Sequence, residues 1–221
     1  GKSSIMDRLT DKPYVKDRQS THAIHLETFT TKILSKNQKP SPLTLNYWDF
    51  GGQDIYHGTH RIIMQSRAIF LLVWDWEGEN NTHKEAEEVE GEGYLHKNYK
   101  VSHWLDYIKS LSKESPVIVV QNKIDKKDNG TRTLKNQESL RESYNIVDFW
   151  HVSAERGRGI QDLQEILKDA IQEMPEWQLE MPATWHKARE IVRKKAKKKS
   201  YIEMDAWEQI CDQAEVREVS R

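Results

Sequence analysis

Short apolar runs separated by amphipathic stretches dominate the chain. The runs at 68–74 (AIFLLVW) and 116–120 (PVIVV) are continuous, and a shorter one covers 149–152. A continuous apolar run predicts a strand that is covered on both faces, which is typical of a parallel sheet. The sequence therefore predicts three buried strands in a mainly parallel sheet.

A hairpin is predicted ahead of these strands. Residues 24–34 contain alternating and β-branched residues, and Leu43, Leu45 and Tyr47 alternate with polar residues up to Asp49. The segment 37–42 between them has turn chemistry, and its two prolines are expected to bar it from a ladder. We expect an antiparallel pair whose second strand ends at Asp49.

Helical periodicity separates the apolar runs. One helix is predicted over 102–111, with Trp104, Leu105, Ile108 and Leu111 on one face, and another over 160–171. Strands that alternate with helices predict an α/β doubly wound fold, with helices on both faces of the sheet.

Two segments interrupt this alternation. Residues 77–98 are polar and acidic and are predicted to be a solvated, mobile insertion. Met174-Pro175 marks a predicted domain boundary. Beyond it we expect a helix from about Ala183, the basic run 193–199, and an amphipathic segment over 202–211. The predicted domains are 1–173 and a small helical one at 174–221.

Composition narrows the function classes. The 221 residues carry a net charge of −1, 31% charged residues and a mean hydropathy of −0.86, which favours a large solvated surface and no global field for nucleic acid. Cys211 is the single cysteine, which excludes an intrachain disulfide. No run has the length of a membrane span and no signal peptide is apparent, so we expect a cytoplasmic protein. The basic run lacks interleaved aromatics, which favours a solvated helix end over a site for nucleic acid or acidic lipid.

The first residues fit part of a phosphate-binding loop. Such a loop needs glycines that turn backbone N–H groups toward phosphate, a lysine that reaches the β- and γ-phosphates, and a hydroxyl for Mg²⁺. Gly1, Lys2 and Ser3 match the last three positions of G-x-x-x-x-G-K-[ST], and Ser4 follows in the same helix start. We expect the first strand and the start of this loop to lie outside the chain as given.

A second motif, Asp49-Phe50-Gly51-Gly52-Gln53, ends the hairpin. Asp49 could support Mg²⁺ through a water molecule, and Gly52 could turn its N–H toward a γ-phosphate. Gln53 could orient the attacking water. A plain glycine turn would not require Asp and Gln at these offsets.

Two further motifs follow the last strands. Asp125 could accept the N1–H and 2-amino donors of guanine, a pair that adenine lacks, while Asn122 and Lys123 brace the loop and the base. Backbone N–H groups of Ser153 and Ala154 could bind the guanine O6. The order of these motifs, each at a strand end where doubly wound folds bind ligands, predicts a guanine-nucleotide site.

On these residues the chain resembles the Ras superfamily of P-loop GTPases, and within it the Roc domain of Roco proteins. The resemblance is carried by Asp49 to Gln53 with Ile55-Tyr56-His57, by Ser20 to His22, and by Pro116 to Asp125. It covers residues 1–173. The remainder resembles the beginning of a COR domain, which implies further domains in the same chain and a homodimer formed through COR.

The resemblance also implies roles for individual residues. Thr21 falls where the switch I threonine binds Mg²⁺ and the γ-phosphate, although Thr10, Thr28 and Thr30 are competitors. It implies Ser3, Thr21 and Asp49 as the Mg²⁺ site and Gln53, Lys2 and Thr21 as the catalytic set. His57 and His60 are expected to be ordinary helix histidines.

The resulting hypothesis is a molecular switch that binds GTP or GDP with Mg²⁺ and hydrolyses GTP. The alternative is a nucleotide-gated or nucleotide-free interaction module without effective hydrolysis.

Overall fold

The computed structural model describes residues 1–16, 18, 24–34, 40–51, 64, 68–81, 83–85, 95–97, 99–127, 130–175, 177, 182–197 and 201–216. The chain divides into two compact units, Gly1–Met174 and Pro175–Arg221. The first unit carries a parallel sheet with helices, and the second is helical.

Three parallel strands form the centre of the first unit: β3 (Phe70–Trp74), β6 (Val117–Gln121) and β7 (Ile146–His151), in the order β3-β6-β7. The three predicted strands are thus confirmed, with ends shifted by up to three residues. The apolar run 116–120 is the central strand, and all five residues of β6 are buried.

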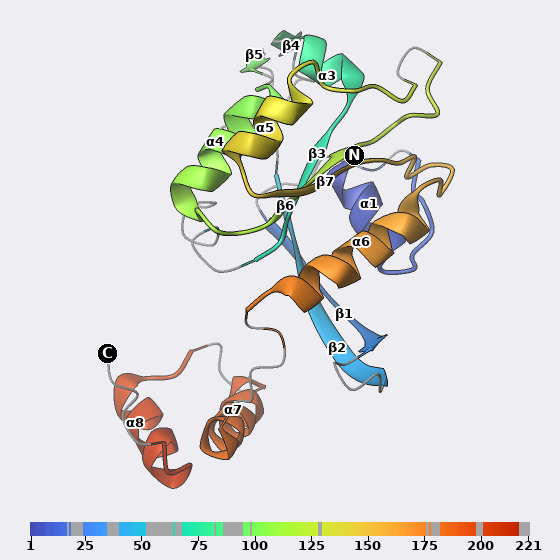
Figure 1. The fold of residues 1–221 in the computed structure, drawn as a ribbon. Helices are drawn as coiled ribbons and strands as arrows, with labels where there is room; N and C mark the ends of the chain where they lie inside the picture. Colours follow the sequence, from blue (N-terminus) through green and yellow to red (C-terminus); the bar gives the residue numbers. More distant parts are fainter. Residues whose placement is uncertain are drawn as a thin grey trace. The chain divides into compact units, whose positions relative to one another are not determined.

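Strand β6 contributes side chains to two hydrophobic cores, because its side chains alternate between the faces of the sheet. Ile118 and Val120 pack with α1 (Lys2–Leu9) and α6 (Ile160–Glu173). Val117 and Val119 pack with α4 (Val101–Leu111) and α5 (Gln137–Ser143). Figure 1 shows these two pairs of helices on opposite faces of the sheet. The predicted α/β doubly wound architecture is confirmed.

Strand β3 has the same continuous apolar character as β6, but all five of its residues are only half-buried. It pairs with β6 along one edge, and among the residues that the structure describes no strand pairs with its other edge. Its side chains instead line a cavity. Full burial of an apolar strand requires a neighbour at each edge as well as helices on each face.

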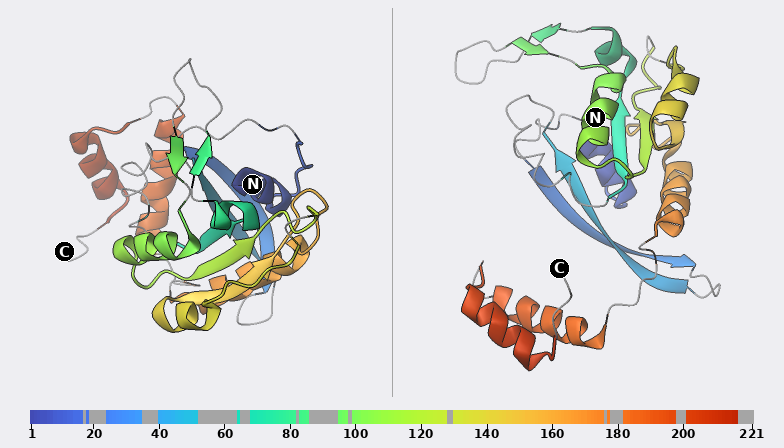
Figure 2. Two further views of the ribbon diagram at one scale, coloured as in Figure 1. Left: turned by 90° about the horizontal axis from the view of Figure 1, so that it is seen from above. Right: turned by 60° about the vertical axis from the view of Figure 1, so that its left-hand side comes forward.

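The antiparallel hairpin is formed by β1 (Ile24–Leu34) and β2 (Pro40–Phe50), in register from Ile24↔Phe50 to Leu34↔Pro40. The expectation that Pro40 and Pro42 stay outside the ladder was wrong. The two prolines lie two residues apart, so their missing N–H groups face the same edge of β2, and pairing through the opposite edge with β1 remains possible. Figure 2 shows the hairpin as a long twisted ribbon.

The hairpin forms a two-stranded sheet of its own within the described ranges, rather than joining the parallel strands by hydrogen bonds. It is attached through side chains. Tyr47 packs against the core under α1 and α6, and Phe50 packs against the core under α4. Asp49, between them in the chain, is buried.

The acidic segment 77–98 contains more secondary structure than the predicted solvated loop. It begins within α3 (Trp76–Asn80), and β4 (His83–Glu85) pairs antiparallel with β5 (Leu95–Lys97). Helix α5 was also missed. These elements are short, and α5 buries only Leu140, so they leave little periodic signal in the sequence.

The second unit contains α7 (Ala183–Ala196) and α8 (Met204–Gln213), which confirms both predicted helical segments. Ala188, Ile210 and Ala214 form its small core. The basic residues of the last turn of α7 are exposed as far as they are described, up to Lys197. No helix in the described ranges is long and apolar enough to cross a membrane.

Candidate functional site

The site is built at the carboxyl ends of the parallel strands, where the start of α1 meets the loops after β3, β6 and β7. Gly1 precedes the helix, and its carbonyl accepts a hydrogen bond from the Ile5 N–H at 3.3 Å. The first N–H groups of a helix lack intrahelical acceptors and carry partial positive charge, so this end of α1 suits an anion. Ile5 and Leu9 anchor the helix in the core.

Ser3 and Asp49 meet across 46 residues of sequence. The Ser3 hydroxyl donates a hydrogen bond to the carboxylate of Asp49, at the end of β2. A hydroxyl beside a carboxylate offers the hard oxygen ligands that Mg²⁺ accepts, with room for the waters and phosphate oxygens that this ion retains. The donor set therefore fits the expected Mg²⁺. Within the described residues no group of three His, Cys, Asp or Glu side chains forms an all-protein metal site.

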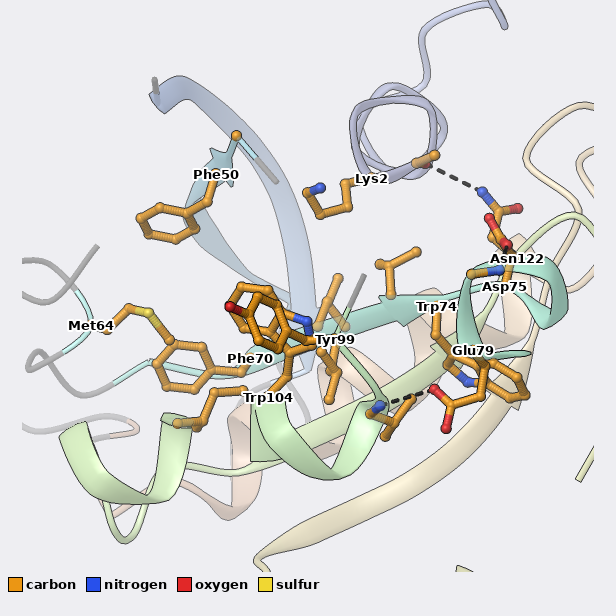
Figure 3. A pocket seen from close by; sticks show the side chains of 18 residues that line it. Lys2, Phe50, Met64, Phe70, Trp74, Asp75, Glu79, Tyr99, Trp104 and Asn122 are labelled. Atoms are coloured by element: carbon orange, nitrogen blue, oxygen red, sulfur yellow. Dashed lines mark hydrogen bonds between the residues drawn. The ribbon is translucent and has the colours of Figure 1, made fainter. Parts of the chain in front are cut away.

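Lys2 lies at the mouth of a cavity of about 340 Å³. Figure 3 shows its ammonium between an aromatic wall, which includes Phe50 and Tyr99, and a polar side with Asp75 and Asn122. Crowding by protein atoms desolvates the ammonium and lowers the pKa of Lys2, while the charge of Asp49 opposes that shift. Lys2 keeps an exposed surface, so water moderates the effect. A phosphate would place further negative charge beside this ammonium.

Asn122 joins three segments that are far apart in the sequence. Its side-chain amide donates to the Gly1 carbonyl at 3.3 Å. Its side-chain oxygen accepts from the Lys123 N–H at 2.8 Å and from the Ala154 N–H at 3.1 Å. Asn122 is 3% exposed, so each of these bonds replaces water that the side chain cannot reach. One side chain thus fixes the helix start, the loop after β6 and the loop after β7 relative to one another.

Asp125 lines a second cavity, of about 220 Å³. Gly1, Asn122, Lys123 and Ala154 also line it, and the Asp125 carboxyl is exposed. We name this the base-side cavity, because the carboxylate predicted to recognise guanine lies in its wall. A polar cavity with a carboxylate and nearby backbone N–H groups can accept a base with paired donors and a carbonyl acceptor.

The loop after β7 is held from two sides. Ser153 pairs with Arg158, its N–H donating to the Arg158 carbonyl at 3.0 Å, and its hydroxyl accepts from the Arg156 N–H at 3.0 Å. Arg8 on α1 donates to the carbonyls of Ala154 at 2.8 Å and Glu155 at 2.9 Å. Arg8 therefore binds two carbonyls of this loop and restrains its backbone.

Three participants were absent from the sequence-based prediction. Arg8 braces the last loop, Asp75 pairs with Lys123 at 2.5 Å, and Tyr14 lines the base-side cavity with the Arg8 guanidinium 6.0 Å from its ring centre. Only Asp75 carried a usable signal, because it follows an apolar strand at the ligand edge of the sheet. Nothing in the local sequence singles out Arg8 or Tyr14.

Among the predicted site residues, the structure brings together Gly1, Lys2, Ser3, Asp49, Asn122, Lys123, Asp125, Ser153 and Ala154, with buried Ser4 inside α1. Thr21, Gly52 and Gln53 lie outside the described residues, as do His57 and His60. Their predicted roles stay predictions. Of the competitors of Thr21, Thr10 is buried at the end of α1 and its hydroxyl bonds to carbonyls of that helix.

Comparison with known proteins supports the predicted family. The family described as "Ras of Complex, Roc, domain of DAPkinase" matches residues 1–125. The chain is 27% identical over 192 residues to the probable serine/threonine-protein kinase pats1 of Dictyostelium discoideum, covering 81% of this chain and 6% of that protein. It is 24% identical over 220 residues to a Roc-COR-CHAT protease of Runella zeae, covering 96% of this chain and 22% of that protein.

A solved structure extends the similarity to three dimensions. Methanosarcina barkeri Roco2 RocCORdC bound to GDP superposes with a TM-score of 0.72 at 28% identity, covering 96% of this chain and 57% of that one. The chain spans 6% of pats1 and 22% of the Runella protease, so it corresponds to one part of much longer relatives. On the family match, the fold and the motif order, the chain belongs to the Roc family of Ras-like GTPase domains.

Proposed function

We propose that this domain binds guanine nucleotide with Mg²⁺ across the two cavities and hydrolyses GTP as a molecular switch. The observation that carries the proposal is the set of three hydrogen bonds made by Asn122. They link the residues proposed for the phosphate end to those proposed for the base end of the site. The Roco2 relative, whose structure contains GDP, supports the choice of nucleotide.

On the base side, Asp125 is proposed to accept the two guanine donors, and the N–H of Ala154 to lie near O6. Tyr14 lines the same cavity, and its ring is proposed to pack on the base. Adenine presents neither donor pair nor carbonyl, so it would leave the Asp125 carboxylate without the two hydrogen bonds that guanine supplies, and the site should discriminate against it.

On the phosphate side, Ser3, Asp49 and Thr21 are proposed to hold Mg²⁺, directly or through water, and Lys2 to neutralise the β- and γ-phosphates. Bound Mg²⁺ would stabilise charge that develops on phosphate oxygens. The N-terminal end of α1 adds to that stabilisation, and Gln53 is proposed to orient the attacking water. Since positioning and electrostatics carry such reactions, intrinsic turnover should be slow.

Two measurements on the full-length protein test the proposal. Calorimetry with GDP and ADP in the presence of Mg²⁺ should give binding to GDP and none to ADP, and equal affinity for both would reject the guanine assignment. Single-turnover GTP hydrolysis in wild type and Gln53→Leu should show a large loss in the variant. Equal rates would remove Gln53 from the mechanism, and bound but unhydrolysed GTP in wild type would favour the nucleotide-gated interaction module.

The helices of the second unit are proposed to be the beginning of a COR domain, because the matches to Roco2 and to the Runella Roc-COR-CHAT protease extend over 96% of the chain. Dimerisation through a complete COR domain remains a prediction. Sedimentation of the full-length protein with and without residues 175–221 would test it.

A further inference from the structure

Asp75, directly after β3, uses its two carboxylate oxygens for two different elements. Oδ1 accepts the Gly78 N–H at 2.8 Å and so caps the start of α3. Oδ2 lies 2.5 Å from the Lys123 ammonium, in the loop after β6. One side chain therefore links a helix start to the loop that forms the base-side cavity.

Lys123 is constrained at both ends. Its backbone has a φ of +63°, a conformation that costs energy for a residue with a side chain and that the surroundings must hold. The Asn122 side chain supplies one restraint by accepting the Lys123 N–H at 2.8 Å. The ion pair with Asp75 supplies the second by fixing the ammonium. Lys123, restrained at both ends, lines the base-side cavity.

The spacing of the two loops follows from the sheet. Trp74 at the end of β3 lies opposite Gln121 at the end of β6, and the Asn122 N–H donates to the Trp74 carbonyl at 2.8 Å. This ladder places the residues after each strand side by side. The side chains of Lys123 and Asp75 are 31% and 21% exposed, so water screens their attraction less than that of a surface pair.

From this geometry we propose that Asp75 is the positioning residue for Lys123. It holds the Lys123 side chain against the base-side cavity and so couples retention of guanine nucleotide to the start of α3. Helix α3 continues the connection, since Glu79 accepts the Val101 N–H at the start of α4 at 2.9 Å. The inference rests on the proposed nucleotide binding. It assigns to Asp75 the role of positioning the loop after β6 for binding the base.

Asp75→Asn in the full-length protein tests the inference, with fluorescent GDP as the probe. Asparagine keeps a side-chain oxygen for the Gly78 N–H but removes the charge that holds Lys123. GDP should dissociate about tenfold faster, which corresponds to about 1.4 kcal/mol. The melting temperature of the nucleotide-free protein should change little.

Asp148→Asn is the matched control. Asp148 also accepts a backbone N–H, from Phe149 at 2.8 Å, and also pairs with a cation, Arg141 at 2.7 Å, but it lies outside both cavities. GDP dissociation should be unchanged in this variant. An equal acceleration in both variants would mean that any lost ion pair loosens the domain, and it would overturn the specific role of Asp75.

A double-mutant cycle separates positioning from general destabilisation. Lys123→Met should itself accelerate GDP dissociation, and Asp75→Asn should add nothing in that background. An additive effect, or no effect of Asp75→Asn in wild type, would overturn the inference while leaving nucleotide binding intact. Absence of GDP binding in wild type would instead overturn the proposed function on which the inference rests.

Discussion

The two ends of the candidate site are constructed differently. At the base end, polar groups are bonded inside the protein: Asn122 to two backbone N–H groups and a carbonyl, Arg8 to two carbonyls, and Ser153 within its own turn. At the phosphate end, a helix start and a desolvated ammonium surround the contact between Ser3 and Asp49. The base end is therefore held together by hydrogen bonds within the protein, whereas the phosphate end presents an ammonium and a helix start that favour an anion.

This difference separates stability from binding. Residues at the base end should contribute to folding even without nucleotide, because their bonds are already made. Residues at the phosphate end should contribute little to folding, or oppose it, because a desolvated ammonium and an open helix end become favourable only with an anion present. The order of expected effects on folding follows from that contrast.

Asn122→Ala should have the largest effect. The substitution removes three hydrogen bonds and leaves the buried Ala154 N–H without its acceptor. We expect a loss of about 3 to 5 kcal/mol in the free energy of unfolding, measured by urea denaturation without nucleotide. Asn145→Ala is the control, because the Asn145 amide donates to the Glu114 carbonyl at an exposed position. Similar losses in the two variants would show that the base end is no better preformed than the surface.

Gly159→Ala should have the next largest effect. Gly159 has a φ of +74°, and an added Cβ would lie 2.4 Å from the His151 carbonyl oxygen, at the turn that carries the last loop into α6. We expect a loss of about 2 to 4 kcal/mol from backbone strain and displacement. Gly157→Ala shares the positive φ of +71° but meets no atom within 4 Å, so it should cost clearly less. Equal melting temperatures for the two variants would refute the close approach as the cause.

The positions of the site loops could be predicted because short-range signals mark them. Apolar runs such as 116–120 define strands, and polar motifs that follow them meet at one edge of a parallel sheet. The prediction placed Asp49, Asn122 and Ser153 at strand ends, and each lies there or within two residues of one. Order along the chain was enough, because the fold brings successive strand ends together.

The bracing of these loops could not be predicted, because it depends on contacts between distant residues. Arg8 reaches Ala154 across 146 positions, and Asp75 reaches Lys123 across 48. In neither pair does the local sequence around one residue identify the other. The half-burial of β3 was missed for a related reason, since an apolar run reports that a strand is covered but not how many neighbours pair with it.

Ser3→Ala should have a smaller effect on folding and a selective effect on metal dependence. The variant removes the hydroxyl that donates to Asp49, one hydrogen bond worth about 1 kcal/mol. By contrast, the increase in GDP affinity on adding Mg²⁺ should fall by about tenfold or more, because a proposed ligand of the ion is lost. Titration calorimetry with GDP, with Mg²⁺ or with EDTA, measures the difference. An unchanged Mg²⁺ dependence would remove Ser3 from the metal site.

Lys2→Met should have the smallest effect on folding and the opposite sign. The lowered pKa of Lys2 means that the folded state disfavours its charged form, so the group destabilises folding most at low pH, and this penalty fades as pH rises through the lowered pKa toward 10.5. Because solvent reaches part of Lys2, we expect the variant to stabilise the nucleotide-free domain by only about 0.5 kcal/mol near neutral pH. Urea denaturation at about pH 7.5 and about pH 10 should show this advantage of the variant shrinking as pH rises.

With GDP and Mg²⁺ present, wild type should instead be more stable than Lys2→Met, because wild type gains ligand stabilisation that the variant lacks. Destabilisation of the empty domain by Lys2→Met would show that the phosphate end, like the base end, is stabilised by its own contacts.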